Sequence, residues 1–463
     1  MSSDTTQHIP ARRIGLSSAL FTVTAVLATL GALFDVRPAL VLGATTLGLF
    51  VLIEFHRIPR VQQIAALVLV AIATVSALRM GDVLHVYGDG LVRTLPFLLV
   101  FAAVGWLRKA AEQSPSIQAL RDGMGEMREG HRFLSLALSA HVMGAGFNLA
   151  GIGLLAPMLD GKVTGADTAR RLRCAILWGF STAASWSPFL VGTAAVLTAL
   201  PAIGWTDALP YGLVMAAGFL IWSVVFDNLT RRNPPVRSSA APPLGQLGLL
   251  RPVGRLLLAI LVLFALTMGL IEGVGMALTT AIAIVGPLYA TGWMLLVHGH
   301  RNGARVGNAA VQVISGYQGM RTETTLFVAA NIFGVAMSEV LPGMAGDVLG
   351  FWQGGPTGVF FFDTLIILWI FLAICAIGIH PIVSLVVFTS AFAPDTLGIP
   401  QPLLAATMMA LWGMGTSVSP LSGTTLIMSQ LSAVSSFTIA WRWNGLFYFL
   451  SSFWVAAVIT MAR

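Results

Sequence analysis

Small and hydroxyl-bearing residues interrupt an apolar stretch in the second half of the chain. Residues 412–430 read WGMGTSVSPLSGTTLIMSQ, and residues 413–425 contain three Gly, one Pro, three Ser and three Thr. Gly and Pro loosen a helix, and hydroxyl groups can bond to the backbone groups that the interruption frees. Neutral oxygens and free amides suit a small oxyanion and a monovalent cation, whereas a tightly held transition metal needs several His, Cys or carboxylate ligands.

The same pattern occurs 234 positions earlier in the chain. Residues 178–193 read WGFSTAASWSPFLVGT, so the spacing W-G-x-x-T-x-x-S occurs twice, each time followed by Ser-Pro and then Gly-Thr. The offset is about half of the 463 residues, which predicts an internal duplication. Paired, interrupted apolar segments in two halves of a chain point to the binding site of a secondary transporter.

The composition is that of a helical membrane protein. The chain is 56% hydrophobic and 10% charged, and its mean hydropathy is +0.84. These values exclude an ordinary soluble domain, and the sequence lacks the alternation of a β-barrel. The two cysteines have no metal-site spacing, and neither a phosphate-binding loop nor a catalytic constellation is present, so no enzyme is expected.

Nine apolar segments have the length of a membrane span, namely about 15–34, 38–55, 62–80, 91–107, 208–228, 253–270, 273–297, 323–341 and 440–461. The duplicated motif lies in two longer segments, 168–205 and 401–433. Two more segments, 132–160 and 361–393, are interrupted in the middle, by Gly146-Phe147-Asn148 and by Gly378-Ile379-His380-Pro381.

The distribution of basic residues predicts how these segments cross the membrane. Segment 132–160 has basic residues on both sides, so it is expected to enter and leave from the cytoplasm as a re-entrant hairpin. The regions beside 361–393 contain no Lys or Arg, which favours a hairpin from the outside. With eleven spans and a cytoplasmic N-terminus, 22 of the 26 basic residues fall inside. The net charge of +7 is therefore interpreted as an orientation signal rather than a nucleic-acid site.

Hairpins that enter from opposite sides predict two inverted repeats, 1–229 and 251–463, joined by a cytoplasmic linker at 230–250. The two hairpin tips and the two helix breaks are expected to meet near the middle of the membrane. The candidate substrate- or ion-binding residues are Asn148 and His380 at the tips, and Ser181, Thr182, Ser185, Ser187, Thr193, Thr416, Ser417, Ser419, Ser422, Thr424 and Thr425 at the breaks.

Several of these residues have a second interpretation. Asn148 could only cap a turn, and His380 could be a neutral structural residue or could titrate and couple protons. The hydroxyl and glycine residues could form a packing face between helices. The carboxylates Glu323, Glu339 and Asp363 lie near span ends, so we interpret them as caps or as hydrated groups rather than ion carriers.

With these features the chain resembles the ion transporter superfamily, and most of all its divalent anion/sodium symporter family. The resemblance covers nearly the whole chain in architecture, and the break at 419–425 is similar in character to the broken helix of several families in the superfamily. That family carries Ser-Asn-Thr at each hairpin tip, where it contacts sodium and the substrate carboxylate. Here only Asn148 matches, and the outer tip has His380-Pro381, which indicates a distant branch. The resemblance implies a homodimer in which a transport domain moves as an elevator against a scaffold.

The sequence therefore predicts an all-α polytopic membrane protein that acts as a secondary active transporter of a small anion, with an organic carboxylate favoured. Sodium or a proton is expected to drive it, no cofactor is expected apart from sodium as a coupling ion, and the partners are the anion, the lipid bilayer and a second copy. The expected location is a bacterial cytoplasmic (inner) membrane. An exporter or antiporter of the same superfamily, or a channel, remains an alternative.

Overall fold

The computed structural model describes residues 14–123, 129–159, 165–230, 246–298, 303–353, 355–391 and 398–463. Every regular element in these ranges is a helix, and eight of the helices are long and apolar enough to cross a membrane. The predicted fold class, an all-α polytopic membrane protein, is thereby confirmed. The predicted total of eleven spans stays a prediction.

The helices of the first half are α1 (Leu16–Phe34), α2 (Arg37–Glu54), α3 (Arg60–Met80), α4 (Val83–Glu112), α5 (Pro115–Gly123), α6 (Glu129–Phe147), α7 (Ala150–Leu155), α8 (Ala166–Ala183), α9 (Val191–Ala199) and α10 (Trp205–Thr230). Those of the second half are α11 (Gln246–Val274), α12 (Leu278–His298), α13 (Gly303–Gly316), α14 (Arg321–Gln353), α15 (Phe360–Ala376), α16 (Pro381–Ala391), α17 (Gln401–Val418), α18 (Gly423–Ser432) and α19 (Leu446–Ala462). A π-helix over Thr438–Gly445 leads directly into α19, and a short 3-10 helix over Tyr317–Met320 leads into α14.

Two of the predicted loops contain helices. The connections at 108–132 and 298–322, which lie between the apolar segments of the sequence analysis, include α5 and α13. Helix α4 likewise starts at Val83, although the predicted span started at 91, and the carboxylate of Asp82 accepts a bond from the backbone N–H of His85 at 3.2 Å. A hydropathy pattern indicates the part of a helix that lies in lipid. The residues at which the helix begins and ends are set by capping and by backbone hydrogen bonds.

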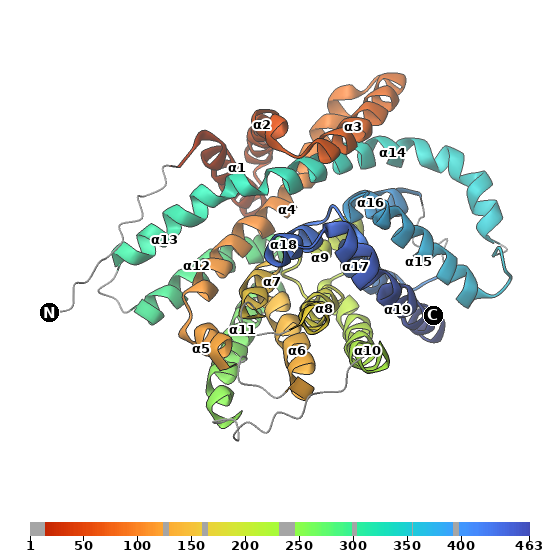
Figure 1. Cartoon of the computed structure of the whole chain (residues 1–463). Coiled ribbons are helices and arrows are strands. Elements are labelled where there is room, and N and C mark those ends of the chain that lie inside the picture. Colours follow the sequence, from red (N-terminus) through yellow and green to blue (C-terminus); the bar gives the residue numbers. More distant parts are fainter. Residues whose placement is uncertain are drawn as a thin grey trace.

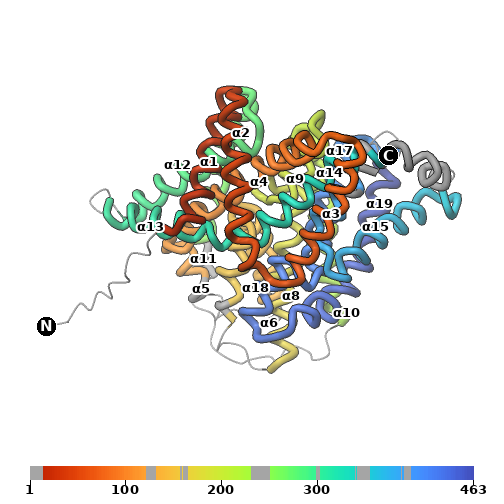
Figure 2. The backbone as a smooth tube through the Cα atoms, turned by 90° about the horizontal axis from the view of Figure 1, so that it is seen from above, coloured from red at the N-terminus to blue at the C-terminus, as the bar shows by residue number. Residues whose placement is uncertain are grey.

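The helices pack as a frame and a core of broken helices. Helices α1, α2, α4 and α12 pack on one another, and α14 lies along α3 and α4 (Figures 1 and 2). The other group contains α6 to α10 and α15 to α19, with α8 against α6 and α17 against α10. Helix α14 also contacts α16, so the frame touches the core at an interrupted segment.

Both interrupted segments are helical hairpins. Helix α6 ends at Phe147, Asn148 follows with a left-handed φ of 54°, and α7 turns back so closely that a Cβ on Gly151 would lie 3.0 Å from the backbone N of Gly144. In the second hairpin Gly378 has a φ of 104°, and Ser384 Oγ lies 3.8 Å from Cys375 Sγ.

The hairpin turns at Asn148 and Gly378 both have a positive φ and are 230 positions apart. Residues 160 and 392–393 of the predicted hairpins, and 231–245 of the predicted linker, lie outside the described ranges. The division into two inverted repeats stays a prediction.

Candidate functional site

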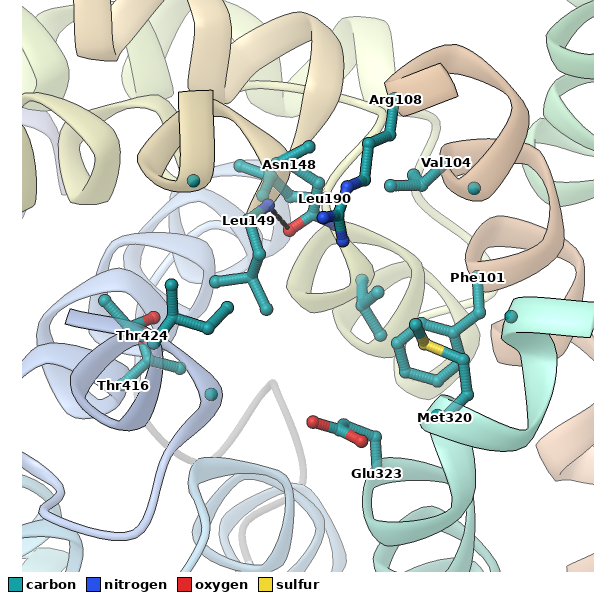
Figure 3. A pocket seen from close by; sticks show the side chains of 18 of the residues that line it. Phe101, Val104, Arg108, Asn148, Leu149, Leu190, Met320, Glu323, Thr416 and Thr424 are labelled. Carbon is teal, nitrogen blue, oxygen red and sulfur yellow. Dashed lines mark hydrogen bonds between the residues drawn. The ribbon is translucent and has the colours of Figure 1, made fainter. Parts of the chain in front are cut away.

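Both hairpin tips and both helix breaks line one cavity of about 760 Å³. Asn148 and Leu149 come from the first tip and His380 from the second, while Leu190 and Thr416 come from the two breaks. The frame closes the other side with α4 and the start of α14, and Figure 3 shows the labelled side chains around this space. The two hairpins and the two broken helices thus meet around one cavity. The cavity has the volume of an ordinary ligand pocket.

The first tip is held to the first break through Asn148. Its Nδ2 donates to the backbone carbonyl of Phe189 at 3.3 Å, and its Oδ1 accepts from the backbone N–H of Leu149 at 2.7 Å. Asn tolerates the left-handed conformation that this turn needs better than most residues do. The side chain is buried, and it stabilises the turn as well as lining the cavity.

Hydroxyl groups bridge the first break, between α8 and α9. The hydroxyl of Ser187 donates to the carbonyl of Ala145 at 2.6 Å, and that of Thr193 donates to the carbonyl of Ser187 at 2.6 Å. The indole N–H of Trp205 donates to the carbonyl of Trp186 at 2.6 Å. Carbonyl groups freed by the interruption are satisfied by side chains in this way, as a break inside an apolar environment requires.

The second break, between α17 and α18, is held in a similar way. The hydroxyl of Ser422 donates to the carbonyl of Thr416, and that of Thr425 donates to the carbonyl of Ser419 at 2.7 Å. Ser422 is also the N-cap of α18, because its Oγ accepts from the backbone N–H of Thr425 at 3.3 Å. The hydroxyl of Ser417 donates within its own helix, to the carbonyl of Gly413 at 3.0 Å.

Two hydroxyl groups at the breaks have no hydrogen-bond partner in the described ranges. They belong to Ser185 and Ser419, both completely buried. These residues occupy the same position of the duplicated motif, 234 residues apart. A buried hydroxyl without a partner is costly, so an unpaired oxygen at the same motif position in each half is a feature that a bound ion or ligand would relieve.

His380 lies at the second tip with one ring nitrogen engaged. Its Nδ1 accepts from the backbone N–H of Ile382 at 3.2 Å, which caps the first turn of α16. The ring also packs edge-on against Trp412 and Phe327, with centroid distances of 5.9 and 6.1 Å. Protonation of Nδ1 would remove this cap, so the geometry supports the structural interpretation of His380 more than the proton-coupling one.

The candidate residues divide into a lining set and a supporting set. Asn148, His380, Thr416 and Thr424 line the cavity. The remaining candidates are buried behind it, and most have protein partners: Ser181 bonds to Tyr448 Oη at 2.5 Å, and Thr182 donates to the carbonyl of Gly179 at 2.7 Å.

Charged residues of the lining were missed by sequence reasoning. Arg108, Lys109 and Glu112 come from the end of α4, and Glu323 comes from the first turn of α14. Arg108 Nε lies 2.9 Å from one oxygen of Glu112, and Lys109 Nζ lies 3.3 Å from the other. The sequence predicts a cap or a hydrated group at Glu323 and leaves Arg108 between two apolar segments, because hydropathy alone does not show that α4 and α14 border the cavity.

The π-helix at Thr438–Gly445 ties the two breaks together. Asn444, fully buried, donates from Nδ2 to the carbonyl of Ser417 at 3.0 Å and accepts at Oδ1 from the indole N–H of Trp178 at 2.9 Å. One side chain thus joins both copies of the Trp-Gly motif. π-Helices are rare and occur mostly at functional sites, which agrees with this position.

Comparison with known proteins identifies the class by fold. No protein-family model matches the chain, and no curated protein matches it by sequence. The solved structure of the YdaH transporter of Alcanivorax borkumensis is similar, with a TM-score of 0.52 and 14% identity over 79% of this chain and 85% of that one. The apolar helices indicate an integral membrane protein, and its fold is similar to that of this solved structure. No family assignment follows from a similarity at this level of identity.

Proposed function

We propose that the protein is a secondary active transporter of a small anion, with an organic carboxylate favoured, driven by sodium or protons. The observation that carries this proposal is the meeting of two hairpin tips and two helix breaks around one cavity. Interrupted helices at a central cavity are how many secondary transporters form their sites, because helix ends supply partial charges inside an apolar protein.

Electrostatics favours an anion beside Arg108 in this cavity. Arg108 extends into the space beside Asn148 and Leu190 (Figure 3). Its Nε is engaged by Glu112, so its terminal nitrogens remain for a carboxylate, which a guanidinium binds in a bidentate manner. The first residues of α18, Gly423 and Thr424, also line the cavity, and a helix N-terminus attracts negative charge.

A cation is accommodated by different groups. The unpaired hydroxyls of Ser185 and Ser419 lie at the breaks, where carbonyl groups have left the helical bonding pattern. Hard oxygen donors without thiolate or imidazole suit sodium better than a transition metal. An anion at the lining and a cation at the breaks would couple the two binding events electrostatically.

Transport in this proposal follows an elevator mechanism. The core of broken helices carries the cavity, while α1, α2, α4 and α12 form the frame against which it moves. Rigid-body movement of one unit against another is the usual basis of alternating access in transporters built from repeats. A homodimer that joins two frames belongs to the same proposal.

The test combines binding with transport. Purified protein is heated with acetate, benzoate, succinate or citrate, each in sodium or potassium buffer, and counterflow of the stabilising anion is then measured in proteoliposomes. A ligand of the folded state at about 100 times its Kd should add about 2.7 kcal/mol of stability. Stabilisation by a carboxylate with saturable counterflow supports the carrier; unitary currents or no response to any anion would refute it.

A matched pair of variants tests the cation site. The double variant S185A/S419A should lose any sodium dependence of carboxylate binding and keep its fold. Ser432→Ala is the control, because that hydroxyl donates only to the carbonyl of Met428 within α18, at 2.6 Å. Sodium dependence that survives the double substitution would place the cation elsewhere.

A further inference from the structure

Glu323 places a carboxylate in the proposed anion cavity. It lies in the first turn of α14, is partly buried, and extends into the space opposite Leu149 (Figure 3). A Cβ atom on Gly423 would lie 3.6 Å from Glu323 Oε1 and 3.1 Å from Leu149 Cδ1. The carboxylate therefore borders both the first residue of α18 and the inner hairpin tip.

No other described side chain pairs with this carboxylate by a hydrogen bond or an ion pair. The nearby basic groups have partners of their own. Arg321, on the same helix, directs its NH1 to Glu54 Oε2 at 3.4 Å, and Glu54 is also paired with Arg57 at 2.9 Å. Arg108 and Lys109 are both engaged by Glu112. The carboxylate of Glu323 is bonded by its own backbone N–H and feels the positive charge of Arg321, but no side chain in the described ranges pairs with it. A carboxylate without a side-chain partner in a transporter cavity is costly and points to a functional group.

Glu323 competes with the substrate anion for the N-terminus of α18. The N-terminus of α18 is where the proposed function places the negative charge of the substrate, and the charged Glu323 already borders it. Two carboxylates at one helix end repel each other in a partly desolvated site. An anion can then bind well only when Glu323 moves away or takes up a proton.

We propose that Glu323 is the proton-carrying group of the transporter, so that a carboxylate substrate binds together with one proton held on the Glu323 carboxyl. The proton enters from the side from which the anion enters. Movement of the core past the frame, in which Glu323 lies, then opens the cavity to the other side, where the proton returns to water after the anion has left. Neither step needs a further reactant. This inference rests on the proposed anion transport and chooses protons, rather than sodium alone, as the coupling ion.

The other titratable groups of the cavity fit this role less well. Arg108 and Lys109 from α4 are paired with Glu112, and Tyr317 before α14 donates its hydroxyl to the carbonyl of Ala102 at 3.3 Å. His380 uses Nδ1 to cap α16, so its protonation would break an existing bond. Among the described titratable residues of the lining, Glu323 is the group that can change charge without losing a side-chain partner.

The experiment measures the affinity of benzoate and succinate for the purified full-length protein as pH is varied. In the wild type, affinity should rise as pH falls between about 8 and 6, by up to about tenfold per pH unit. Glu323→Gln should bind at high pH as tightly as the wild type at low pH, without dependence on pH. In proteoliposomes this variant should keep counterflow and lose accumulation driven by a pH gradient.

Two further variants keep the test decisive. Glu323→Asp retains a titratable carboxyl and should retain the pH dependence, which covers the case that the Gln variant fails to fold. Glu112→Gln changes a carboxylate of the same cavity that already has partners, so the pH dependence should persist.

The contrary outcomes are distinct. Wild-type affinity that does not change with pH overturns the inference and leaves sodium-driven transport standing. Weaker binding by Glu323→Gln at every pH also overturns it, because the carboxylate of Glu323 would then support binding of the anion rather than oppose it. Absence of binding and counterflow for every carboxylate would instead refute the proposed function itself.

Discussion

At the scale of single residues, the site depends on side chains that replace backbone hydrogen bonds. Asn148, Ser187 and Thr193 bond to carbonyl groups at or near the first break, and Ser422 and Thr425 do the same at the second. These residue types are therefore explained in part by local structure. At the breaks, the buried hydroxyls of Ser185 and Ser419 form no such bond in the described ranges and remain for a ligand.

The turn at Asn148 gives the first prediction. Asn148→Gly should lose the bond to the carbonyl of Phe189, and with it about 1 kcal/mol of unfolding free energy. Asn148→Ala should lose about 1 kcal/mol more, because an L-residue with a side chain is strained at a φ of 54°. Thermal unfolding in detergent measures the difference, and equal stability of the two variants would show that the turn relaxes.

Asn444 gives a second prediction. Asn444→Ala would leave both the indole N–H of Trp178 and the carbonyl of Ser417 buried without a partner, at a cost of about 1–3 kcal/mol for each group. The melting temperature should fall by several degrees. Thr460→Ala in α19 is the control, because its hydroxyl bonds only within that helix. An equal fall in melting temperature for the two variants would show that Asn444 does not hold the two breaks together.

The sequence predicted part of this residue-level picture. Gly, Pro, Ser and Thr inside apolar segments identified both breaks, and an Asn and a His at interrupted helices identified both tips. Arg108 and Glu323 were missed for a physical reason: a charge near a span end has the same local pattern whether it faces water or a cavity. The three-dimensional placement of α4 and α14 distinguishes these cases.

At the scale of elements, glycine sets how closely the broken helices cross. A Cβ on Gly413 would lie 2.5 Å from the carbonyl oxygen of Ser181, and one on Gly179 would lie 2.1 Å from that of Ala137. The Trp-Gly motif thus brings α17 onto α8, and α8 onto α6, at backbone contact. The sequence found the motif and its spacing, but it did not show that its glycines are crossing points.

This close approach leads to a third prediction. Gly413→Ala should destabilise the protein by about 1–3 kcal/mol or more, because the contacted atom is backbone and cannot move aside. Gly269→Ala in α11 should be neutral or slightly stabilising, since nothing lies within 4 Å of its added methyl group. Thermal unfolding of the pair, with size-exclusion profiles, is the measurement. A harmless Gly413→Ala would mean that the helices separate at low cost.

At the scale of the whole molecule, the charge distribution and the cavity lining together predict the side of the membrane to which the cavity opens. The cavity is lined by Arg108, Lys109 and Glu112 at the end of α4, and by Gln312 of α13. The distribution of basic residues predicts that both segments lie on the cytoplasmic side. This predicted topology, together with the cavity lining, predicts that the conformation is open to the cytoplasm. Hydropathy and charge can predict the orientation of the helices in the membrane. The side on which the cavity opens depends on helix packing, which one sequence does not show.

Cysteine accessibility tests this sidedness and is the last prediction. Both native cysteines are buried, so a cysteine introduced at exposed Gln312 can be labelled selectively. A membrane-impermeant maleimide should label Gln312→Cys in inside-out vesicles and not in right-side-out ones. Leu84→Cys, at the opposite end of α4, should show the reverse, because this side chain is 89% exposed. Exchange of the two patterns would invert the topology, and labelling of Gln312→Cys from both sides would refute a single cytoplasmic opening.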